Sequence, residues 1–230
     1  MSIKVLIPCA GNGSRFGADV PKQYMEISPN KCVLDYTLQS FLAVEEISEI
    51  LIITSSNDIL IDSIVALYND VRLFVHKVGG DTRAKTVANG LRAMSLAVVD
   101  DWILVHDAAR CLIKPNLIKH LINELRDDAV GGILALPVND TVKNVVGGVI
   151  QTTLDRQQIY LAQTPQMFRY SVLYNALTNC DLDSITDEAS AVESLGFIVR
   201  VVCGDPTNIK ITHPHDLPLA RFFSEFSEYN

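Results

Sequence analysis

The sequence predicts an α/β fold, a doubly wound and mostly parallel sheet of the Rossmann-like kind. Short apolar segments, several of them apolar throughout, alternate with segments in which apolar residues recur at helical spacing. The expected strands are Ile3–Cys9, Ile50–Thr54, Leu73–Val78, Trp102–His106, Ile133–Val138 and Ile198–Val202. Helical spacing is found within 34–42, 60–67, 84–91 and 117–125. In a βαβ succession of this kind, ligands bind at the carboxyl ends of the strands.

The composition fits one domain, residues 1–230, of a cytoplasmic protein. With 48% hydrophobic residues the chain can bury a substantial core, yet no apolar run approaches the ~20 residues that cross a membrane. A first strand that begins almost at once leaves no room for a signal peptide. The five cysteines are scattered and form no C-x-x-C pair, which predicts reduced thiols and no metal site among them. The net charge of −8 argues against nucleic acid as a partner.

Residues 137–159 interrupt the alternation of strands and helices, because no helical pattern occurs there. Val142–Val146 and Val149–Thr153 flank Gly147 and Gly148, which predicts a β-hairpin. An isolated hairpin is marginal in water and needs a surface to lie on. We expect a protruding β-arm that packs on a second subunit of a homodimer. A hairpin folded back on its own domain is the alternative.

The loop after the first predicted strand is the most informative segment of the chain. It combines Gly11 and Gly13 with the cations Arg15 and Lys22. Glycines let backbone N–H groups approach a triphosphate, and the cations can neutralise its charge. A plain strand-to-helix turn beside two solvated cations would also need glycine, but the Pro21-Lys22 pair favours the nucleotide interpretation. With that pair the segment resembles the G-x-G-[ST]-R-x5-P-K signature of nucleotidyltransferases.

Two other nucleotide-binding motifs fit this loop less well. The Walker A loop needs Gly-Lys-Ser/Thr in direct succession, which the chain lacks. The dinucleotide fingerprint needs a third glycine where Phe16 stands, and an acidic residue after the second strand, where the chain has Thr54 and Ser55. A nicotinamide-dependent dehydrogenase is therefore not expected.

Two further loops follow predicted strands and carry polar groups. Gly80 can bring backbone close to a base or ribose, and Asp81 can accept hydrogen bonds there; Asp81 or Thr82 can equally cap the next helix. Farther along, Asp107 can take a hydroxyl group or a divalent ion, and Arg110 can take a phosphate. A simple ion pair between Asp107 and Arg110 is the competing interpretation.

Three later segments complete the set of candidates. Thr141 and Arg156 lie at opposite ends of the predicted hairpin and suit hydroxyl or phosphate contacts, although alone they read as turn residues. Asn208–Thr212 alternates like a strand and presents Lys210 opposite its apolar neighbours. Thr186–Ala189 is best explained as a capped helix start, and we give it little catalytic weight.

Taken together, these motifs resemble the family of 2-C-methyl-D-erythritol 4-phosphate cytidylyltransferases of the non-mevalonate isoprenoid pathway, over nearly the whole chain. Nine of them occur in the family's order and near its spacing: Ala10–Arg15, Pro21–Tyr24, Gly79–Arg83, His106–Arg110, Asp140–Lys143, Asp155–Arg156, Thr164–Gln166, Thr186–Ala189 and Asn208–Lys210. The departures are Cys9 where the family usually has Ala, Thr86 where it has Ser, and Cys111 where it has Pro, in a loop one residue shorter.

The resemblance implies a nucleotidyltransferase fold and a role for each matched residue. Arg15, Lys22 and Lys210 would be catalytic, around the CTP phosphates. The implied nucleotide-binding residues are Cys9, Ala10, Gly11, Asn12, Gly13, Gly80, Asp81, Thr86 and Asp107. The implied contacts with methylerythritol phosphate are Arg110, Thr141 and Arg156, the last two from the arm of the partner subunit. Mg²⁺ is expected on the CTP phosphates, with Asp107 as the candidate protein ligand.

The implied reaction is attack of the substrate's phosphate on the α-phosphorus of CTP, with pyrophosphate leaving. That phosphate is already anionic near pH 7, since its second pKa is about 6, so no general base is required. A cytidylyltransferase for another polyol phosphate, such as ribitol 5-phosphate, is the nearest alternative. A catalytically silent nucleotide-sensing protein is the other, but it predicts loss of the cations, and Arg15, Lys22, Arg156 and Lys210 are all present.

Overall fold

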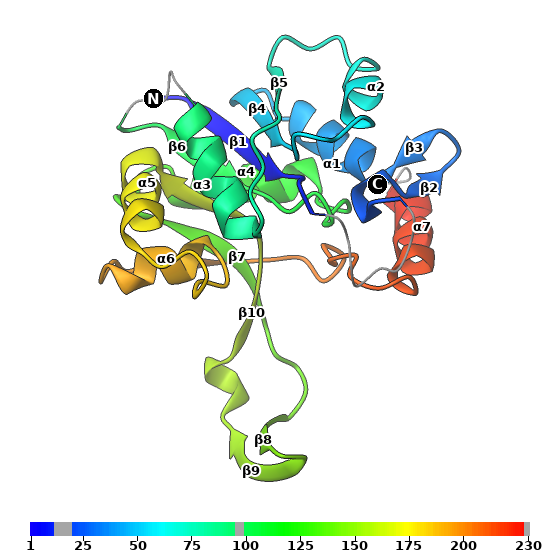
Figure 1. Cartoon of the computed structure of the whole chain (residues 1–230). Coiled ribbons are helices and arrows are strands. Elements are labelled where there is room, and N and C mark those ends of the chain that lie inside the picture. Colours follow the sequence, from blue (N-terminus) through cyan, green and yellow to red (C-terminus); the bar gives the residue numbers. More distant parts are fainter. Residues whose placement is uncertain (12–19, 95–98, 228–230) are drawn as a thin grey trace.

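The computed structural model describes residues 1–11, 20–94 and 99–227, which are built around a seven-stranded sheet (Figure 1). The sheet strands in chain order are β1 (Ile3–Pro8), β4 (Ile47–Ile53), β5 (Leu73–His76), β6 (Trp102–Val105), β7 (Gly131–Pro137), β10 (Tyr160–Arg169) and β11 (Arg200–Cys203). Their spatial order is β11-β7-β10-β6-β1-β4-β5. Strand β10 is antiparallel to β6 and β7, and the other pairs are parallel. The expected doubly wound, mostly parallel sheet is confirmed.

Helices cover both faces of the sheet, which is why a central strand such as β6 is apolar along its whole length. In β1, Val5 and Ile7 join a core cluster with α1 (Val33–Leu42) and α4 (Pro115–Leu125). Leu6 joins a second cluster with α3 (Arg83–Ala93), α5 (Tyr170–Asn179) and α6 (Glu188–Ser194). A strand buried on both faces has no side left for polar residues. The helices are α1 (Val33–Leu42), α2 (Ile61–Val65), α3 (Arg83–Ala93), α4 (Pro115–Leu125), α5 (Tyr170–Asn179), α6 (Glu188–Ser194) and α7 (Asp216–Ser227).

A third, smaller cluster lies outside the sheet and shapes the segment that carries Lys210. Helix α7 packs there with the short hairpin of β2 (Glu26–Ser28) and β3 (Lys31–Cys32). Ile211 is fully buried in this cluster. The expected strand at Asn208–Thr212 is wrong, because the segment forms no ladder with a neighbouring strand. The segment is anchored instead at its two buried residues, Asn208 and Ile211, and the N–H of Ile211 donates to Ala109 O at 2.8 Å.

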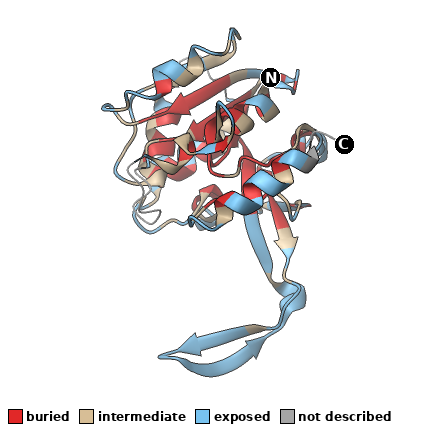
Figure 2. Ribbon diagram, turned by 90° about the vertical axis from the view of Figure 1, so that its right-hand side faces the viewer, coloured by how far each residue is buried: buried red, intermediate tan, exposed pale blue. Residues whose placement is uncertain are grey.

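The predicted hairpin exists and projects from the body of the protein (Figure 1). Strands β8 (Val142–Val146) and β9 (Val149–Leu154) pair antiparallel around Gly147 and Gly148. These glycines have φ of 59° and 81°, the left-handed values that a two-residue hairpin turn of this type requires. Nearly every arm residue is exposed (Figure 2), and one short 3-10 helix, η2 (Arg156–Gln158), lies where no helix was expected.

Candidate active site

Two glycine-containing loops lie side by side at the carboxyl edge of the sheet. The N–H of Cys9 donates to Ile53 O, and the N–H of Gly79 donates to Thr54 O, each at 2.7 Å. A Cβ atom on Gly79 would stand 2.3 Å from the Cβ of Ala10 and 2.8 Å from Thr54 O. Only glycine permits that approach, so the contact between the two loops requires glycine at position 79.

The second loop runs into the first turn of α3. The Thr86 hydroxyl accepts the N–H of Gly80 at 3.1 Å and donates to Thr82 O at 2.9 Å. Thr82 is the N-cap of α3, because its hydroxyl accepts the N–H of Lys85 at 3.2 Å. Of the two expected caps Thr82 is therefore confirmed, which leaves the side chain of Asp81 exposed at the loop tip.

The first loop and its cations are described only in part. Asn12, Gly13 and Arg15 lie outside the described residues. Gly11 is exposed, and a Cβ there would meet nothing within 4 Å. Lys22 begins the 3-10 helix η1 (Lys22–Tyr24).

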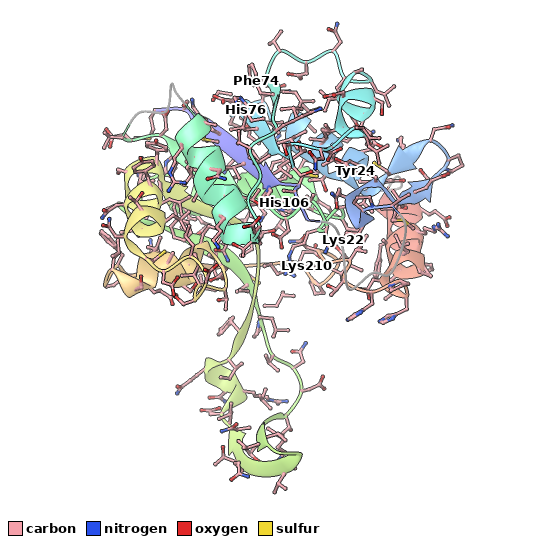
Figure 3. The ribbon with its side chains drawn as sticks, viewed as in Figure 1. Lys22, Tyr24, Phe74, His76, His106 and Lys210 are labelled. Atoms are coloured by element: carbon pink, nitrogen blue, oxygen red, sulfur yellow. The ribbon has the colours of Figure 1, made fainter. Side chains whose placement is uncertain are left out.

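Lys22 and Lys210 approach one another from opposite ends of the chain (Figure 3). The Lys22 Nζ donates to Ile211 O at 3.1 Å, so it meets the segment that carries Lys210. Because Ile211 is an anchor in the small cluster, the neighbouring Lys210 is held at the edge with 40% of its side chain exposed.

Asp107 lies at the centre of a chain of alternating charges. Its Oδ1 is 2.6 Å from the Nε of Arg83, and its Oδ2 is 2.6 Å from the Nζ of Lys210. Asp107 therefore forms ion pairs with Arg83 and Lys210 in place of the ion pair with Arg110 that was the competing interpretation. Burial alone would raise the pKa of Asp107, but Arg83 and Lys210 outweigh it and hold that pKa far below its ordinary value.

Glu188 completes this chain of charges from the start of α6. Its carboxylate binds Arg83 in a bidentate fashion, at 2.6 Å and 3.0 Å, and the residue is 1% exposed. Burial lowers the pKa of Arg83, but Glu188 and then Asp107 more than compensate and raise it above its ordinary value. The expected capped start of α6 is confirmed, since Asp187 accepts the N–H of Ser190 at 3.0 Å. The motif did not predict the ion pair that the next residue, Glu188, forms with Arg83.

Arg110 donates hydrogen bonds to neutral carbonyl groups, so its positive charge is available to bind a ligand. Its guanidinium donates to Asn208 O at 2.8 Å and to Ala162 O at 3.2 Å. Its Nε is buried and has no partner among the described residues. Burial lowers its pKa, although a guanidinium remains charged. An anionic group would satisfy both the unpaired N–H and the charge.

His106 supports this edge and is unsuited to acid–base chemistry. Thr164 Oγ1 accepts the N–H of Asp107 at 3.1 Å. The hydroxyl proton of Thr164 is then donated to Nδ1 of His106, also at 3.1 Å. The other ring nitrogen, Nε2, then donates to Arg110 O at 3.1 Å. Burial lowers the pKa of His106 to about 3, so the ring is neutral at pH 7 with both nitrogens engaged. Cys9 is also inert, because burial raises the pKa of its thiol.

The structure does not bring the arm residues to the edge where Lys22 and Lys210 lie. Thr141 and Arg156 are exposed at the two ends of the hairpin, and Arg156 donates to Asn139 O. Figure 1 shows the hairpin extending away from the sheet.

Neither a protein-built metal cage nor a membrane span is found in the described parts of the chain. No group of three or more His, Cys, Asp or Glu side chains there is arranged to hold a metal ion. Both oxygens of Asp107 are engaged by cations, so the expected metal ligand is already occupied by protein partners. No helix among the described residues has the length and apolar character needed to cross a bilayer.

A doubly wound sheet whose carboxyl edge joins glycine loops to converging cations defines the class of α/β nucleotidyltransferases. Within that class, the family model of 2-C-methyl-D-erythritol 4-phosphate cytidylyltransferase (IspD) matches residues 3–225. The chain therefore belongs to this family.

Named relatives and solved structures agree with this family. The chain is 47% identical over 217 residues to the 2-C-methyl-D-erythritol 4-phosphate cytidylyltransferase of Laribacter hongkongensis, with 94% of this chain and 93% of the relative covered. It is 48% identical to that of Chromobacterium violaceum, covering 94% and 95%. The crystal structure of the Francisella tularensis enzyme aligns with a TM-score of 0.83 at 35% identity, covering 97% of this chain and 100% of the other.

Proposed function

We propose that this cytidylyltransferase transfers the cytidylyl group of CTP to 2-C-methyl-D-erythritol 4-phosphate, in isoprenoid precursor synthesis. The products are 4-diphosphocytidyl-2-C-methyl-D-erythritol and pyrophosphate. The observation that carries the proposal is the convergence of Lys22, Lys210 and Arg110 beside the glycine loops. Family membership supplies the identity of the two substrates.

The chemistry requires positioning and charge stabilisation rather than a nucleophile from the protein. The acceptor phosphate attacks the α-phosphorus of CTP in line, and a P–O bond forms as the bond to pyrophosphate breaks. Lys22 and Lys210, together with Arg15, would stabilise the charge that builds on the α-phosphate. The neutral His106 and the protonated Cys9 are consistent with a reaction that needs no general base.

The acceptor would be held by both subunits of a homodimer. Arg110, whose Nε lacks a partner among the described residues, suits the phosphate of methylerythritol phosphate. Thr141 and Arg156 would reach the site from the partner's arm, which is consistent with a hairpin that extends away from its own sheet (Figure 1). The exposed Val145, Val146 and Ile150 give the arm an apolar surface to bury in such a dimer.

A divalent cation, for which we propose Mg²⁺, would bind together with the nucleotide rather than in a site built from protein ligands alone. Mg²⁺ is commonly held by substrate phosphates with one or two carboxylates. Asp107 could join it only if Lys210 or Arg83 released an oxygen, because both oxygens are paired. When bound, the ion would supply additional neutralisation of the phosphate charge.

The test is pyrophosphate release from CTP with each acceptor in turn. We expect turnover with methylerythritol phosphate and little with ribitol 5-phosphate; the reverse would assign another polyol phosphate, and CTP binding without turnover would indicate a nucleotide sensor. Lys22→Ala should reduce turnover about 10²–10³-fold, by analogy with losing one oxyanion-stabilising donor. Lys119→Ala, on α4, is the control and should retain wild-type turnover, because the proposed reaction assigns this lysine no contact with either substrate. Near-normal turnover of folded Lys22→Ala would refute this mechanism.

A further inference from the structure

Gln23 is a buried polar residue beside Lys22 to which the reaction assigns no role. It lies on η1 and is 5% exposed. Its Nε2 donates to Cys9 O at 3.0 Å and to Gly11 O at 3.3 Å. Because both partners are carbonyl oxygens, the amide nitrogen must face them, and both of its protons are used.

These two hydrogen bonds fix the direction of the peptide groups in the first glycine loop. In a trans peptide the C=O and the following N–H point in opposite directions. Holding the carbonyl of Cys9 toward Gln23 therefore turns the N–H of Ala10 away from it. No acceptor for that N–H is found among the described residues, and the Cβ direction at Gly11 is open. An outward N–H in a glycine loop is a donor suited to a phosphate oxygen.

The helix that carries Gln23 is itself fastened on two sides. Lys22 reaches Ile211 O, as described above, and the Tyr24 hydroxyl donates to Oδ2 of Asp58 at 2.5 Å. Asp58 in turn accepts the N–H of Ile61 at the start of α2. Gln23 thus links the loop to a segment held at both of its ends, and the same segment carries Lys22.

We propose that Gln23 is a positioning residue for nucleotide binding, an inference that rests on the proposed function. It holds the carbonyls of Cys9 and Gly11 inward, so that the N–H of Ala10 faces outward toward the phosphates of CTP. It also fixes the position of that loop relative to Lys22. The role concerns the nucleotide alone, since the contacts of Arg110 lie on other segments.

The experiment measures CTP affinity by titration calorimetry without acceptor, and then the KM of each substrate. Gln23→Met keeps the length of the side chain but removes both donors, and should raise the Kd and KM of CTP about ten-fold or more. The KM of methylerythritol phosphate should change less than about two-fold, since no donor to it is lost. Gln23→Glu, nearly isosteric, should weaken CTP binding further, because a carboxylate would face two carbonyl oxygens.

Gln39→Met on the exposed side of α1 is the matched control and should bind CTP as the wild type does. A lower melting temperature with unchanged CTP affinity would mean that Gln23 is merely structural, and equal losses for both substrates would also overturn the proposal. Should Gln23→Met fail to fold, Gln23→Glu provides the same comparison. If the wild type released no pyrophosphate with any acceptor, the proposed function would fail, while the CTP titration would still decide the role of Gln23.

Discussion

At the residue scale, His106 shows how burial selects a protonation state. The ring lies between Thr164 and the backbone of Arg110 and packs edge-on against Phe41, with ring centroids 4.9 Å apart. A second proton would turn Nδ1 into a donor and add a cation close to Arg83 and Arg110. Burial is the main cause that lowers the pKa of His106 to about 3, and the two arginines lower it further.

This depressed pKa predicts a pH dependence of stability. Between about pH 6.5 and pH 3 the unfolded chain binds a proton at His106 that the folded chain does not, so the free energy of unfolding decreases as the pH falls. From pH 7 to pH 5 this group alone should remove about 2 kcal/mol. Denaturant unfolding at both pH values should show that loss in the wild type and a smaller one in His106→Gln. Equal losses in the two proteins would contradict the assignment.

At the scale of elements, one partly buried arginine joins the starts of α3 and α6 to the end of β6. Arg83 stands at the first position of α3, Glu188 at the first position of α6, and Asp107 just after β6. Each helix start is separately capped, by Thr82 and by Asp187. The ion pairs therefore set how the two helices lie against the sheet, and through Asp107 they reach Lys210.

Removing one partner of this network should be costly, because it leaves a buried charge without full compensation. Glu188→Gln should lower the free energy of unfolding by about 3 kcal/mol, at the low end for a broken buried pair, since Arg83 keeps Asp107. The loss should appear in denaturant titrations together with reduced turnover. Asp183→Asn is the control, since Asp183 pairs with Lys85 at the surface, where its side chain is 63% exposed. Comparable losses in both variants would show that burial of the Glu188 pair contributes nothing.

At the scale of the whole molecule, the arm separates residues that the proposed reaction needs together. Its hairpin has too little core for independent stability and exposes Val149 and Ile150 at 62% and 59%. A second subunit that covers this surface would bring its own Thr141 and Arg156 to the neighbouring site. The active unit would then be a dimer with two shared sites.

Subunit mixing tests this arrangement. Lys22→Ala and Arg156→Ala proteins should each be impaired, but a mixed dimer has one site in which both residues are intact. After random exchange of subunits, about one quarter of wild-type turnover should return. Pyrophosphate release from the mixture, with sedimentation to confirm the dimer, measures this. No recovery despite exchange would favour an arm that serves its own chain.

Much of the fold could be predicted because its signals are local. The apolar runs at Ile50–Thr54 and Trp102–His106 are typical of buried strands, and Gly147-Gly148 between two alternating segments is typical of a tight turn. Strand β10 was overlooked, because its apolar residues are mixed with Gln163, Thr164 and Gln166, whose partners are buried polar groups far away in sequence.

The sequence by itself determined most of the parallel strands and the helices between them, the hairpin of the arm and the residue types of the candidate site. Periodicity, glycine and charge are properties of short segments, so each could be recognised without knowing its neighbours. Only the tertiary structure decided that Asp107 pairs with Arg83 and Lys210 and that Glu188 is buried behind them. These pairings depend on which side chains are buried next to one another in the folded protein. The separation of residues 83 and 188 along the chain carries no information about that.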